Sequence, residues 1–156
     1  MISRLDYCIS VLNGITKQQT SRLQSILNAS ARLVFGSRRF SSITPLLQRL
    51  EWLPVQRRIQ FRLAVLVLSC RLHKAPGYLT SLIRDVGSHS GRAGLRSSSS
   101  SKLTVPFSRR PTLGGRRFSV AAPLTWNDLP IALRNTSVLP SFKRLLRQYL
   151  SDVSDV

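Results

Sequence analysis

The stretch LEWLPVQRRIQFRLAVLVLSCRLHKAPGYL, residues 50–79, decides the fold. Pro54 can open a helix and Pro76 breaks one, so we expect a helix over about 54–74. Its middle, residues 63–68, is apolar on every side and must be covered from more than one direction. Basic residues stand at both ends. The stretch therefore predicts a core helix whose tips face water or a polyanion.

Apolar residues at helical spacing predict further helices before and after this core. Trp126 would face inward from one of them, with Pro123 in its first turns, and Thr44 would be the N-cap of another. We therefore expect a mainly α fold, a small helical bundle around the helix at 54–74 with C-terminal helices. The other expected helices cover residues 3–13, 17–35, 44–50, 119–129 and 141–150.

The composition changes after residue 86, where Ser, Gly and Arg replace the apolar periodicity. A segment of this kind cannot bury enough apolar surface to order itself. We expect three parts: a helical domain at 1–85, a basic Ser/Gly/Arg-rich linker at 86–117, and a C-terminal helical tail at 118–156 that packs on the first. The alternation in KLTVPF also predicts a short strand or hairpin near 102–118.

The charge of the chain is strongly unbalanced. The 156 residues include 24 Lys plus Arg and 6 Asp plus Glu, for a formal net charge of +18. Of the basic residues 20 are Arg, whose planar guanidinium holds phosphate with two hydrogen bonds. No acid occurs between Asp6 and Glu51 or between Asp85 and Asp128. The expected partner is the phosphate backbone of RNA or DNA; the alternative is that the Arg content only reflects a GC-rich coding sequence.

The candidate phosphate contacts are eight arginines that occur in adjacent pairs. Four aromatic residues, Phe40, Phe107, Phe118 and Tyr149, lie close to Arg or Lys and are suited to stack on bases, although rings in such positions more often belong to the core. The eight arginines are Arg38, Arg39, Arg57, Arg58, Arg109, Arg110, Arg116 and Arg117.

Catalytic chemistry is not expected. A polymerase or nuclease site needs carboxylates that converge on divalent cations, whereas the six acids here are spread along the chain. Cys70 and His73 have C-x-x-H spacing, with Cys8 and His89 as distant further ligands, but a free Cys on an apolar helix face is more often a core residue. We therefore expect no enzyme activity, no metal, no other cofactor and no small-molecule substrate.

Two features bear on location. The cysteine usage and the lack of a long apolar segment at the start favour a reducing compartment. The sequence does not fix the location further, which is intracellular, nuclear or cytoplasmic, if the chain is expressed. The longest apolar run, residues 63–68, is far too short to span a bilayer, so no membrane contact is expected.

Segments along essentially the whole chain, taken in order, resemble a known family. The most specific are LEWLPVQRRI, HKAPGYL and FSVAAPLTWNDLP, and ISRLDYCISVLNGI and LRSSSSSKLTVP add to them. They are similar to the carboxy-terminal end of the reverse transcriptase polyprotein of LINE-class, non-LTR retrotransposons of the chicken-repeat and jockey groups. Where the family has an apolar residue and a glycine, this chain has Arg71 and Lys74. That departure indicates drift or a degraded copy.

The resemblance implies that residues 1–85 are thumb-like, while the palm with its metal-binding acids and the endonuclease lie upstream in the parent polyprotein. The chain would be a catalytically silent C-terminal fragment that binds RNA or DNA backbone without sequence specificity, with the upstream palm and thumb as a further partner. The matched blocks carry no catalytic residue over. Two alternatives stay open: a relic open reading frame without selected function, and an independent basic RNA-binding adaptor.

Overall fold

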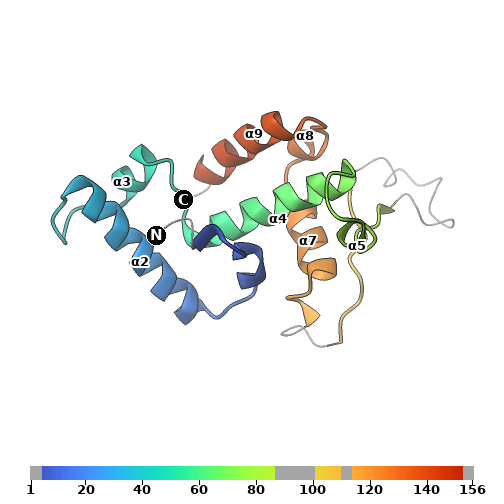
Figure 1. Ribbon diagram of the computed structural model, residues 1–156, viewed down its shortest axis with the longest axis horizontal. Helices are drawn as coiled ribbons and strands as arrows, with labels where there is room; N and C mark the ends of the chain where they lie inside the picture. Colours follow the sequence, from blue (N-terminus) through green and yellow to red (C-terminus); the bar gives the residue numbers. More distant parts are fainter. Residues whose placement is uncertain (1–4, 87–100, 110–113, 153–156) are drawn as a thin grey trace. The chain divides into compact units, whose positions relative to one another are not determined.

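The computed structural model describes residues 5–86, 101–109 and 114–152, and it is mainly helical (Figure 1). The expected mainly α fold class is confirmed. In these three ranges no helix combines the length and the apolar character needed to cross a membrane. The elements are the 3-10 helix η1 (Ile9–Leu12) and the α-helices α2 (Lys17–Phe35), α3 (Thr44–Arg49), α4 (Val55–Arg71), α5 (Gly77–Thr80), α7 (Phe118–Asn127), α8 (Ile131–Arg134) and α9 (Leu139–Asp152).

The chain forms two compact units. The first comprises Met1–Phe61 and Arg147–Val156, and the second comprises Arg62–Leu146. Both boundaries fall inside helices, α4 and α9, so each of these helices contributes to both units. The units are defined by contacts and differ from the segments 1–85, 86–117 and 118–156 that composition predicted.

In the first unit, α2 has the bounds that its periodicity predicts. The Thr16 hydroxyl accepts from the Gln19 N–H and the Gln19 side chain accepts from the Thr16 N–H, a reciprocal cap that fixes the start. Gly36 ends the helix in the left-handed region, with φ of 58°. The inward face carries the buried residues Leu27 and Ala31.

Two local expectations in this unit are wrong. A continuous helix over 3–13 is interrupted because Cys8 has a left-handed backbone, with φ of 54°, and only the 3-10 helix η1 follows it. The N-cap of α3 is Ile43 and not Thr44, so Thr44 is the first helical residue and no side chain caps this end. Short helices of this kind depend on tertiary contacts more than on capping.

Helix α4 is the expected core helix. It begins at Val55, whose N–H donates to the side-chain oxygen of Gln24 on α2 (2.8 Å). It ends at Arg71, short of the expected residue 74, because His73 has a left-handed backbone with φ of 53°. Most of its apolar middle is covered, as predicted: the buried residues there are Leu63, Ala64, Val67 and Leu68.

In the second unit, α7 holds the segment 101–104 by its side chains. The indole N–H of Trp126 donates to the Ser101 carbonyl (2.9 Å), and the Asn127 amide pairs with both backbone groups of Leu103 (2.8 Å each). Trp126 is fully buried, so the prediction that it faces inward is confirmed. Trp126 and Asn127 of the FSVAAPLTWNDLP block therefore dock the segment 101–104 onto α7.

The short strand or hairpin expected near 102–118 does not form in the described residues 101–109. Leu103 makes a single antiparallel bridge with Asp85, supported by hydrogen bonds from Val86 to Lys102 and from Thr104 to Arg84. The ladder ends there because the next partner of Leu103 is the Asn127 side chain and not a second strand. The short helices α5 and α8, each starting after a proline, were not expected.

Candidate nucleic-acid interface

The first basic element is the turn at residues 38–41, which we call the 38–41 turn. The Ser41 N–H donates to the Arg38 carbonyl (3.1 Å), which places Arg39 and Phe40 at the two central positions. All of Arg38, Arg39 and Phe40 are exposed, and Phe40 is 95 % exposed. A guanidinium of Arg32, near the end of α2, donates to the Ser41 carbonyl (3.4 Å). The hydrogen-bonded turn therefore exposes two cations and one aromatic ring to solvent.

The second basic element, which we call the Phe107 cluster, consists of Phe107, Arg109, Arg116 and Arg117. Phe107 is 87 % exposed and the three arginines are exposed. Gly114 lies against the Ser108 side chain, which a Cβ at Gly114 would meet. This contact brings the segment ending at Arg109 next to the segment that starts α7. Arg109 follows Ser108 directly, and Arg116 and Arg117 follow Gly114 by two and three residues, so all three lie in the stretches that this contact joins.

The α4 pair behaves differently from these two elements. Arg57 is half-buried and donates to the Gln60 side chain (3.0 Å). Arg58 is only 8 % exposed and forms an ion pair with Asp6 (2.8 Å). Arg58 is therefore a structural residue and its assignment as a phosphate contact is corrected. Arg110 lies outside the described residues.

The acids that the structure describes are mostly paired with arginine. Besides Asp6 with Arg58, Asp85 pairs with Arg71 (3.4 Å) and Glu51 pairs with Arg147 (3.5 Å). Each partner comes from a distant part of the sequence, which sequence spacing does not reveal. Within the described ranges, none of these carboxylates pairs with the arginines of the 38–41 turn or the Phe107 cluster. Arg38, Arg39, Arg109 and Arg116 are left to face solvent or an external anion, whereas the Arg117 guanidinium donates to the Gly114 carbonyl (3.3 Å).

The prediction that rings near basic residues belong to the core is wrong for Phe40 and Phe107, while Phe118 and Tyr149 are half-buried. A sequence signal existed for both exposed rings: each is followed by Ser and lies within two residues of Arg, in a stretch without helical periodicity. No sequence signal predicted the guanidinium of Arg49 over the Phe35 ring, at 4.8 Å from its centroid.

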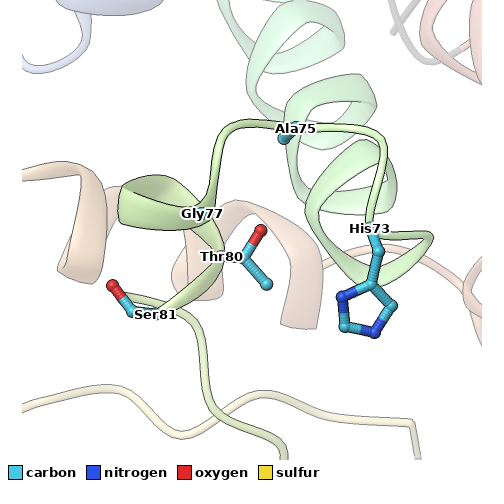
Figure 2. Close-up of a pocket in the computed structure, with 5 residues that line it drawn as sticks. All are labelled: His73, Ala75, Gly77, Thr80 and Ser81. Atoms are coloured by element: carbon cyan, nitrogen blue, oxygen red, sulfur yellow. The ribbon is translucent and has the colours of Figure 1, made fainter.

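A separate hollow of about 410 Å³ lies in the second unit, between the end of α4 and α5. Figure 2 shows His73 on the turn after α4, and Thr80 and Ser81 at the end of α5, around this opening. Both hydroxyls donate to backbone carbonyls, Thr80 to Pro76 and Ser81 to Tyr78. The hollow therefore offers one imidazole and no carboxylate, which is a poor set for acid–base catalysis.

The nearby Cys70 thiol is not an activated nucleophile. Burial raises its pKa above the ordinary value, and a hydrogen bond with the Thr80 side chain lowers it by less. A thiol with a raised pKa is protonated at neutral pH and reacts slowly. Across the part of the chain that is described, no three His, Cys, Asp or Glu residues gather as metal ligands would.

Comparisons of the chain with known protein families, with curated proteins and with solved structures found no significant match. The candidate interface therefore stands on its residues and their geometry.

Proposed function

We propose that this chain binds the phosphate backbone of RNA or DNA without sequence specificity, as a catalytically silent part of a LINE-class retrotransposon reverse transcriptase. The family assignment rests on the sequence resemblance alone. The proposal of binding is supported by charge and geometry and does not depend on the family assignment.

One observation carries the proposal. The exposed arginines Arg38, Arg39, Arg109, Arg116 and Arg117 have no carboxylate partner among the described residues, in a chain of net charge +18. An exposed guanidinium without a partner binds phosphate through counterion release, and this term does not depend on base sequence. Arg57 and Arg117 are weaker candidates because their guanidinium groups already donate, to the Gln60 side chain and to the Gly114 carbonyl.

A salt titration of oligonucleotide binding tests the proposal. Each engaged phosphate contributes a slope of about −0.9 on duplex, or about −0.7 on a single strand, to the plot of log affinity against log salt concentration. Contact by several arginines predicts a total slope of several units. A slope near zero, or no binding in dilute buffer, would refute the proposal.

Paired variants separate local contact from overall charge. The double variant Arg38→Gln with Arg39→Gln should reduce the slope of log affinity against log salt concentration by the contribution of about two phosphate contacts. A matched control is Lys143→Gln with Arg144→Gln, an exposed pair on α9 that removes the same charge. The control should change the slope less. Equal losses in both variants would show that the field of the whole chain acts, and not the 38–41 turn.

One observation favours the alternative of a relic product without selected function. Helix α2 exposes large apolar side chains: Ile26 is 48 %, Leu33 is 83 % and Val34 is 60 % exposed. Such a face promotes association and dye binding. A cooperative thermal transition of a monomer that binds no hydrophobic dye would contradict the alternative.

A further inference from the structure

We infer that the polyanion is single-stranded and that its bases stack on Phe40 and Phe107. The inference rests on the proposed function and adds to it the class of nucleic acid. The observation behind it is the exposure of Phe40 and Phe107, because an apolar ring is more stable in a protein core than in water.

The exposure of these rings is unusual. Phe is among the residue types most often buried, because its ring gains free energy on leaving water. Phe40 and Phe107 keep 95 % and 87 % of their accessible surface. By contrast, the Trp126 ring lies 5.7 Å from the Phe142 ring and has the Arg71 guanidinium at 5.5 Å. The two exposed rings therefore have free faces to offer to a ligand.

The setting of each ring matches the chemistry of a nucleotide. Phe40 directly follows Arg38 and Arg39 on a hydrogen-bonded turn, and Phe107 lies two residues before Arg109. A guanidinium takes the phosphate and the adjacent ring takes the base, which is how single-strand-binding surfaces combine charge with stacking. Two separate elements of the chain show this same combination.

A duplex fits this arrangement less well. Its bases are paired and stacked inside, so a ring reaches them only after they are unstacked, and unstacking costs free energy. The bases of a single strand are open to an aromatic face. The combination of ring and cation therefore favours a single strand, whether RNA or DNA.

The experiment compares three probes of equal charge with the full chain: an oligothymidylate of about 20 nucleotides, an abasic oligomer of the same length, and a blunt duplex. The tested protein is the double variant Phe40→Leu with Phe107→Leu. Leucine keeps an apolar side chain but cannot stack on a base. Phe40→Trp and Phe107→Trp form the rescue pair, and Tyr78→Leu is the control, since Tyr78 is 70 % exposed outside both basic elements. Circular dichroism checks that each variant folds.

We expect the wild-type chain to bind oligothymidylate more tightly than the abasic oligomer. The Leu variant should lose about fivefold or more of that affinity and keep its affinity for the abasic oligomer and the duplex. The Trp pair should restore binding, and the Tyr78 control should be unchanged. An oligo-uridylate in place of oligothymidylate tells RNA from DNA.

The failures of the two proposals are distinguishable. If the wild-type chain binds none of the three probes, the proposed function fails. If it binds all three with a steep salt dependence and the Leu variant binds oligothymidylate as well as the wild type does, only the stacking inference is overturned. Tighter binding to vesicles that contain an anionic phospholipid, retained in the Leu variant, would also overturn it in favour of a lipid surface.

Discussion

Replacing Trp126 by Ala should destabilise the second unit more than other single changes in α7. The side chain is fully buried, its N–H donates to the Ser101 carbonyl (2.9 Å), and its ring contacts Phe142 and Arg71. Removing a buried Trp side chain costs about 3–5 kcal/mol from the lost transfer free energy and the cavity left behind. A domain of this size is stable by only about 5–15 kcal/mol, so the loss is a large share.

The Phe variant separates the hydrogen bond from the packing. Trp126→Phe keeps a ring beside Phe142 but leaves the Ser101 carbonyl without its donor, a cost of about 1–3 kcal/mol. The expected order of destabilisation is Trp126→Ala above Trp126→Phe, and both above Leu124→Ala. Leu124 lies on the same helix and is 51 % exposed, so its truncation should cost less than about 1 kcal/mol.

Urea unfolding followed by far-ultraviolet circular dichroism measures these differences. Helix content is the better signal because Trp126 is one of two tryptophans, and its removal changes the fluorescence. Equal midpoints for Trp126→Ala and Leu124→Ala would refute the reasoning that α7 is anchored by this side chain.

Four further predictions concern single groups. Asp6→Asn should lower the free energy of unfolding by about 1–3 kcal/mol, because it leaves the buried Arg58 guanidinium without its counter-charge. The control Asp152→Asn, at an exposed position of α9, should change the free energy of unfolding by less than about 0.5 kcal/mol. Urea unfolding measures both. Gln24→Ala should cost about 1 kcal/mol by the same measurement, because the first N–H of α4 loses its acceptor, and an unchanged midpoint would contradict this. A disulfide reagent at about pH 8 should modify the exposed Cys8 quickly and Cys70 only on unfolding. The pKa of the Cys70 thiol is raised in the folded state, so its contribution to the free energy of unfolding is complete below the ordinary thiol pKa and falls as the pH rises above it. The wild-type chain should therefore lose more stability between neutral and high pH than Cys70→Ala does, and equal losses in the two proteins would count against this.

The helices with strong local signals follow from the sequence. The range of α2 was predicted because its cap residues, its apolar spacing and the glycine after it all lie within the helix or next to it. The inward direction of Trp126 was predicted for the same kind of reason. Local backbone preference and apolar periodicity act over one or two turns, so a single sequence is enough to read them.

The docking of the segment 101–104 could not be read from the sequence. Its alternation suggests a strand, but the polar partner of Leu103 is the side chain of Asn127, 24 residues away. An amide side chain can satisfy a backbone N–H and C=O as a neighbouring strand would. Sequence spacing does not tell these two partners apart.

The sequence by itself determined the helical class, the core helix and the excess of cations, because these depend on composition and on periods of a few residues. The tertiary structure decided which cations are neutralised: Arg58 is buried against Asp6 across 52 positions, while Arg38 and Arg39 stay exposed. It also decided that Phe40 and Phe107 lie in water. Burial and ion pairing depend on which distant residues meet, and only the folded chain brings those residues together.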